Sequence, residues 1–72
     1  MKLETLRKRL NSKNANQLAE YCRHNMKWKK MHLICLLTDS GCEVPQNYRW
    51  DKLCNAYKEE IIDIIIETYE GA

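Results

Sequence analysis

Residues 50–69 of this 72-residue chain read WDKLCNAYKEEIIDIIIETY, and this stretch decides the expected fold. At roughly 100° per residue, an α-helix gathers its large apolar residues in one sector and its charged residues in the opposite sector. Isoleucine is β-branched and favours strands, but an apolar spacing near 3.6 over a long window outranks local propensity. The stretch therefore predicts one long amphipathic helix. The residues expected on its buried face are Trp50, Leu53, Cys54, Tyr57, Ile61, Ile64 and Ile65.

Five isoleucines lie between positions 61 and 66, so the apolar face is wider than one packing partner requires. Ile62 and Ile66 fall toward the acidic side of the helix, and we expect both to be half-exposed in a monomer. An exposed apolar strip beside a charged row usually marks a contact surface. The residues predicted to bind a partner are Ile62, Ile66, Tyr69, Glu59, Asp63 and Glu70.

Three shorter helices are expected before this one. The first covers about residues 2–10, where leucines recur at i, i+3 and i+7. The second opens at Asn14, with Gln17 completing a capping box, and we expect it to break near Asn25. The third covers about residues 27–38 and is apolar on every side in its last turns, which predicts a central position.

The third helix is expected to end before Gly41, a residue suited to the left-handed conformation after a helix. The last helix then begins at Pro45 or Asn47. The predicted fold class is all-α, a compact bundle of about four helices with a long C-terminal amphipathic helix, and residues 1–72 form one small helical domain. Two alternatives stay open: helices two and three can be continuous, and residues 31–37 and 61–66 can pair as buried strands.

Length and charge limit the possible classes of protein. A chain this short buries only about 60% of the surface that its unfolded form exposes. Its apolar runs are far shorter than the roughly 20 residues of a membrane span, and its charged N-terminus does not resemble a secretory signal. We therefore expect a soluble, cytoplasmic protein with no membrane partner.

The net charge of +2 hides a strong polarity along the chain. Residues 1–30 carry nine lysines and arginines against two glutamates, whereas residues 59–72 carry five acidic residues and no basic one. Either the basic half pairs with the acidic helix inside the molecule, or one of these faces meets a partner of opposite charge.

Metal and catalytic chemistry have little support in the sequence. The four cysteines match no short-spaced disulfide or zinc framework, and we expect reduced core cysteines. Cys22, His24, His32, Cys35 and Cys42 include zinc-ligating residue types but no tight Cys-x2-4-Cys pair, so we predict no metal site. Cys42 follows Gly41 in a loop, but Asp39 and Glu43 beside it disfavour a reactive thiolate. We expect no enzymatic activity, no cofactor and no small-molecule substrate.

Two functions are compatible with these features. The leading hypothesis is a non-enzymatic protein-interaction module, either a homodimer or a small stoichiometric regulator or inhibitor of a larger cytoplasmic partner, of the kind that phages and mobile elements encode. The alternative is a small nucleic-acid-binding protein that uses its basic N-terminal half, with a helix-turn-helix-like arrangement around residues 17–30. At its spacing from Met31 and Cys35, Trp28 is expected in the core rather than stacked on a base. The residues predicted for this alternative are Arg7, Lys8, Lys27, Lys29 and Lys30.

Overall fold

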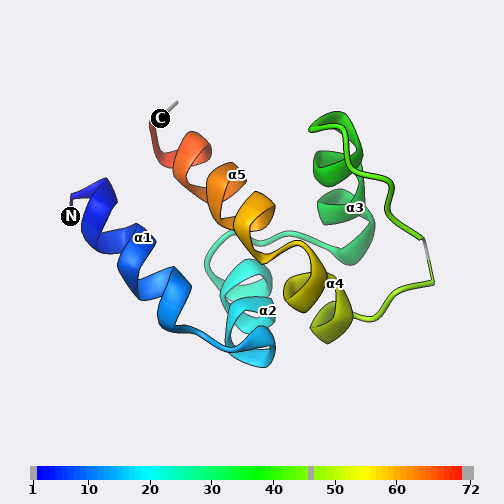
Figure 1. Cartoon of the computed structure of the whole chain (residues 1–72), viewed down its shortest axis with the longest axis horizontal. Coiled ribbons are helices and arrows are strands. Elements are labelled where there is room, and N and C mark those ends of the chain that lie inside the picture. The colour runs from blue at the N-terminus through cyan, green and yellow to red at the C-terminus, as the bar shows by residue number, and fades with distance from the viewer. Residues whose placement is uncertain (1, 46, 71–72) are drawn as a thin grey trace.

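Five helices form in the part of the chain that the computed structural model describes, residues 2–45 and 47–70 (Figure 1). They are α1 (Leu3–Ser12), α2 (Ala15–His24), α3 (Lys30–Asp39), α4 (Trp50–Ala56) and α5 (Lys58–Glu70). No strand forms within these residues, so the all-α prediction is confirmed and the strand alternative for residues 31–37 and 61–66 is wrong. The bundle has one helix more than the four expected.

The additional helix arises because the predicted long C-terminal helix is interrupted at Tyr57, whose backbone leaves the helical region at φ −121° and ψ 34°. The Tyr57 hydroxyl donates a hydrogen bond to the carbonyl oxygen of Glu43, in the loop before α4. A straight helix over residues 50–69 would run about 30 Å in one direction. The break instead lets α4 pack against α2, while α5 packs against α1, α3 and α4.

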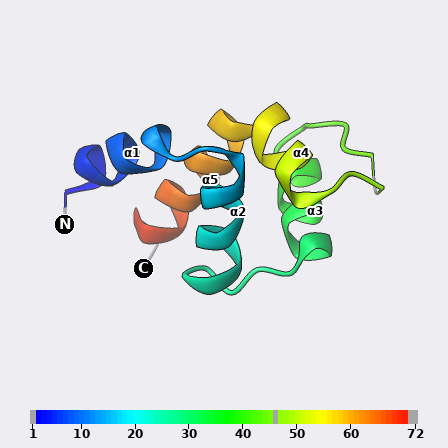
Figure 2. The same cartoon turned by 90° about the horizontal axis from the view of Figure 1, so that it is seen from below.

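Helix α5 lies in the middle of the molecule, with α1 on one side of it and α3 on the other (Figure 2). α1 runs antiparallel to α5, as two contacts show. Arg7 pairs with Asp63 at 2.8 Å, and four residues later the carbonyl oxygen of Asn11 accepts from the ammonium group of Lys58 at 2.8 Å. The wide apolar sector of α5 thus has more than one packing partner. All five of its isoleucines are buried.

This packing overturns the expectation that Ile62 and Ile66 are half-exposed. Their relative exposures are 0% and 6%. At roughly 100° per residue both lie on the same side of Asp63, and the pairing of Asp63 with Arg7 places α1 next to this side of α5. The apolar strip is therefore part of the core.

The second helix begins as predicted. The side chain of Asn14 accepts from the backbone N–H of Gln17, and the side chain of Gln17 accepts in return from the backbone of Asn14, which completes the capping box. The helix ends at His24, so α2 and α3 are not continuous and the predicted break near Asn25 is confirmed. The next helix, however, begins at Lys30 and not near residue 27.

The connection between α2 and α3 turns at Lys27, which has a left-handed backbone with φ 58°. The backbone N–H of Trp28 then donates to the carbonyl oxygen of Cys22 at 3.0 Å. This turn brings the Trp28 side chain into the core, where it is 7% exposed. The prediction of a core role for this tryptophan is confirmed.

We expect Lys27→Gly to stabilise the fold. A left-handed conformation costs an L-residue about 1 kcal/mol, and glycine removes that cost. Part of the gain is lost because glycine makes the unfolded chain more flexible. The expected net gain in unfolding free energy is up to about 1 kcal/mol, measured by urea denaturation. Lys27→Ala is the matched control, because it removes the same charge and keeps the strain; equal stability of the two variants would contradict the proposed cause.

The prediction of a central position for α3 is wrong. Leu33, Ile34 and Leu37 are buried, whereas Met31 is 50% exposed and Cys35 is also exposed. The reason is the edge position of α3, whose principal packing partner is α5 alone. One face of the helix is therefore covered and the other lies at the surface.

The ends of the loop between α3 and α4 agree with the sequence in part. Gly41 adopts φ 95°, as predicted for the residue after a helix. The next helix begins at Trp50, later than the predicted start at Pro45 or Asn47. Of the five helices described, none is both long enough and apolar enough to cross a bilayer.

Candidate interaction cleft

A cleft opens where α1, the C-terminal half of α2 and the last turn of α5 meet. In Figure 1 the N-terminal end of α1 and the C-terminal end of α5 lie at the same end of the molecule. The cleft is open to solvent on one side and has a volume of about 790 Å³. Its lining residues are Leu3, Leu6, Arg9, Leu10, Lys13, Tyr21, Asn25 and Tyr69.

The apolar side of the cleft comes from the leucine stripe of α1. Leu6 and Leu10 are buried and Leu3 is partly buried, so the stripe serves the core and also lines the cleft. Leucines at i, i+3 and i+7 lie on one face of a helix, which explains why one short segment supplies this whole wall.

Two tyrosines from distant parts of the chain form the opposite wall. The hydroxyl groups of Tyr21 and Tyr69 share a hydrogen bond of 3.0 Å that joins α2 to α5. Burial, reinforced by this hydrogen bond, raises the pKa of Tyr21 well above its ordinary value. The hydrogen bond keeps the two rings in a defined arrangement. Tyr69 is 44% exposed, so its ring remains accessible from the cleft.

The charged residues that line the cleft, Arg9 and Lys13, are both cations. The ammonium group of Lys13 lies 5.8 Å from the centre of the Tyr21 ring, a cation–π geometry that holds it at the rim. Arg9 is exposed. The cleft thus combines an apolar wall, two aromatic rings and a positive edge.

The structure separates the residues predicted to bind a partner into three groups. Tyr69 lines the cleft. Ile62 and Ile66 are in the core, where they cannot touch a partner of the folded protein. Glu59, Asp63 and Glu70 lie exposed on α5.

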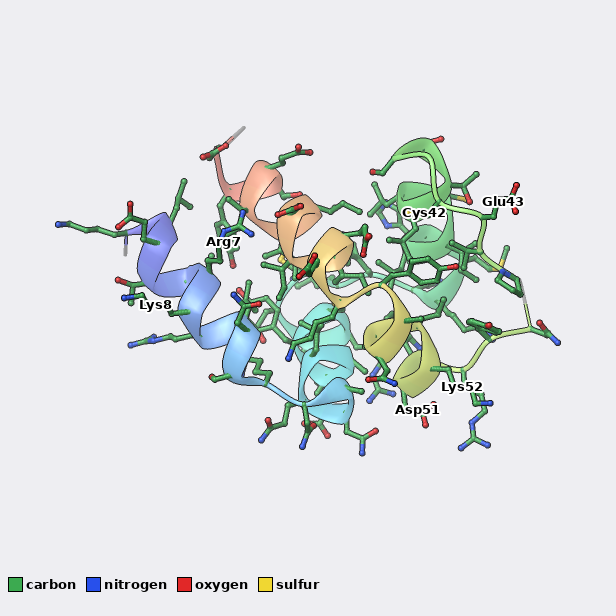
Figure 3. All side chains as sticks on the ribbon, in the orientation of Figure 1. Arg7, Lys8, Cys42, Glu43, Asp51 and Lys52 are labelled. Carbon is green, nitrogen blue, oxygen red and sulfur yellow. The ribbon has the colours of Figure 1, made fainter. Side chains whose placement is uncertain are left out.

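Asp63 already has a partner, because its carboxylate meets Arg7, which extends from α1 toward α5 (Figure 3). Within residues 2–45 and 47–70, this is the one ion pair that joins the basic N-terminal helix to the acidic C-terminal helix. The two helices therefore attract each other as one sequence hypothesis expected, but most of their charges face solvent.

The residues of the basic alternative do not gather on one surface of a helix. Arg7 faces Asp63, while Lys8 is exposed on another side of α1 (Figure 3). Lys27 and Lys29 are exposed in the α2–α3 connection and Lys30 is the first residue of α3. A helix-turn-helix packs its two helices across a turn of three or four residues. Here α2 packs mainly against α4, so the helix-turn-helix-like arrangement expected around residues 17–30 does not form.

The cysteines divide into a buried pair and two outer residues. Cys22 and Cys54 are fully buried between α2 and α4, as predicted for core thiols. A hydrogen bond with Cys54, together with burial, raises the pKa of Cys22, which keeps this thiol protonated and a poor nucleophile. Cys35 is exposed and Cys42 partly buried, so the core prediction is wrong for Cys35.

The described residues bring no three potential metal ligands together. In the candidate zinc set, Cys22 is enclosed between α2 and α4, whereas His32 and Cys35 are exposed on α3.

Compared with known protein families, characterised proteins and solved structures, the chain shows no significant similarity to any of them.

Two features of the cleft could not be read from the sequence. The leucine stripe of α1 is visible as a spacing, but nothing in the sequence singles out Tyr21 or separates Arg9 and Lys13 from the other basic residues. The signal that could have drawn attention to Tyr21 and Tyr69 is the tyrosine hydroxyl, which at the edge of a core needs a polar partner. Which partner it finds depends on how the tertiary fold places α2 relative to the end of α5.

Proposed function

We propose that this chain is a non-enzymatic protein-interaction module that regulates or inhibits a larger cytoplasmic partner by stoichiometric binding, and that the cleft between α1, α2 and α5 is its contact site. The observation that carries the proposal is the accessible ring of Tyr69 beside the leucine stripe of α1. Tyrosine is enriched among the residues that contribute most to protein interfaces, because it combines a large apolar ring with a polar end.

The construction of the cleft supports this function. Three helices supply its walls, so the recognition surface exists only in the folded protein. The hydrogen bond between Tyr21 and Tyr69 orders the aromatic wall before a partner arrives. Such preorganisation lowers the entropy that is lost on binding.

The proposed site differs from the one that the sequence predicts. Tyr69 stays in the proposed site, and Leu3 and Tyr21 replace the buried isoleucines 62 and 66 as its apolar part. The exposed carboxylates of Glu59 and Glu70 lie on the same helix as Tyr69 but outside the lining of the cleft, so they are not part of the proposed site.

Affinity capture from the organism that encodes the chain tests this function. We expect the tagged wild-type protein to retain a defined protein partner after nuclease treatment, and Tyr69→Ala to lose it. Met31→Ala is the matched control, because Met31 is a large hydrophobic side chain of similar exposure, 50% against 44% for Tyr69, but lies on α3. A partner that Tyr69→Ala still retains would place the interface elsewhere.

The same experiment separates the alternative functions. Loss of the captured material on nuclease treatment would favour the nucleic-acid-binding alternative. The variant Lys27→Glu with Lys29→Glu should then also fail to capture it, since phosphate contacts depend on such cations. A dimer in light scattering that Tyr69→Ala converts to a monomer would identify a second copy of the chain as the occupant of the cleft.

A further inference from the structure

The proposed function does not specify the chemistry of the partner. The residues that line the cleft limit which chemical classes of partner can bind there. The accessible apolar lining consists of Leu3 and the rings of Tyr21 and Tyr69, so the occupant must bring apolar side chains. The charged lining residues, Arg9 and Lys13, are cations, so it must also bring acidic groups. An acidic amphipathic segment satisfies both requirements.

The shape of the site favours a helical segment. The lining residues that α1 and its C-cap supply run from Leu3 to Lys13, about 15 Å along the helix axis, which matches three turns of a helix lying alongside. An amphipathic helix in such a groove inserts large apolar residues spaced at i, i+3 or i+4, and i+7. Acidic residues that flank those positions would then face the basic edge.

We infer that the cleft binds an acidic amphipathic helix of a partner protein, with its apolar anchors between Leu3 and Tyr69 and its carboxylates against Arg9 and Lys13. This inference depends on the proposed function and adds the chemical class of the partner. Attraction between opposite charges at the rim raises the association rate and selects acidic over basic segments.

The acidic helix of a second copy does not have this chemistry. α5 carries the acidic residues, but its isoleucines are buried against α1, α3 and α4. Among the described residues, Tyr69 is the only large apolar side chain of α5 that is exposed. A second copy would have to unfold before its α5 could act as an apolar anchor.

Selection from a display library of random peptides about 16 residues long, or roughly 24 Å as a helix, tests the inference on the wild-type protein. The selected peptides are expected to carry an excess of acidic residues and apolar residues with helical spacing. Their affinity, measured by fluorescence anisotropy, should fall about tenfold for Arg9→Glu with Lys13→Glu and show a clear dependence on salt.

Matched variants make the result specific to the cleft. Lys8→Glu reverses an exposed charge of α1 outside the cleft lining and should leave the affinity within about twofold. Tyr69→Ala should abolish measurable binding, whereas Met31→Ala should not. Circular dichroism of every variant should match the wild type, which ensures that loss of binding does not reflect unfolding.

Three outcomes would overturn the inference. They are selection of basic or uncharged peptides, equal effects of Lys8→Glu and the double reversal, and saturation of the cleft by palmitate or by single-stranded DNA when acidic peptides do not bind.

If the cellular partner depends on Tyr69 but is indifferent to Arg9 and Lys13, the proposed function stands and only the acidic class is wrong. If acidic peptides bind the cleft but no cellular partner depends on Tyr69, the regulatory function fails and the peptide chemistry stands.

Discussion

Changing both Ile62 and Ile66 to serine should unfold the protein. Each side chain is buried where α1 covers α5, and truncating one such isoleucine costs about 2–5 kcal/mol through lost apolar transfer and the remaining cavity. Serine adds a hydroxyl group without an assigned partner, which raises the cost further. A domain of this length is stable by only roughly 4–11 kcal/mol, so two such losses remove most or all of its stability.

Thermal melting followed by circular dichroism at 222 nm measures this effect. Glu59→Ser with Glu67→Ser is the matched control, since it places two serines at exposed positions of the same helix. We expect the control to melt cooperatively near the wild-type temperature and the isoleucine variant to lack a folded baseline at 25 °C. A folded isoleucine variant would mean that α1 does not cover this side of α5.

Trp28→Ala should produce the second large effect. The indole is 7% exposed and is placed in the core by the left-handed turn at Lys27. Truncating a buried tryptophan costs about 3–5 kcal/mol. Most of the stability of the domain would be lost, and urea denaturation should show a correspondingly lower midpoint.

Trp50→Ala provides the comparison for that experiment. Trp50 begins α4, is only partly buried, and has the guanidinium group of Arg23 5.8 Å from the centre of its ring. We expect its replacement to cost less than half as much as that of Trp28, because less apolar surface is buried. A cost below about 1 kcal/mol for Trp28→Ala would remove this residue from the core and return the base-stacking hypothesis to consideration.

The parts of the fold that were predictable from the sequence depend on interactions within one or two helical turns. The capping box of Asn14 and Gln17, the end of α2 near Asn25 and the left-handed Gly41 all follow from local backbone chemistry. The helical character of residues 61–66 was also predictable, because periodicity outweighs the strand preference of isoleucine.

Tertiary contacts decided the features on which function depends. The break at Tyr57 accompanies a hydrogen bond to Glu43, fourteen residues away, and Ile62 is buried because α1 returns antiparallel to α5. Helical spacing shows that a face is apolar, but it does not show how many neighbours cover that face. The cleft is the strongest case, since Tyr21 and Tyr69 lie 48 residues apart and meet only because the fold brings α2 and the last turn of α5 to one end of the leucine stripe. Sequence periodicity indicates which residues a helix can bury. Which of them are buried depends on the helices that pack around it.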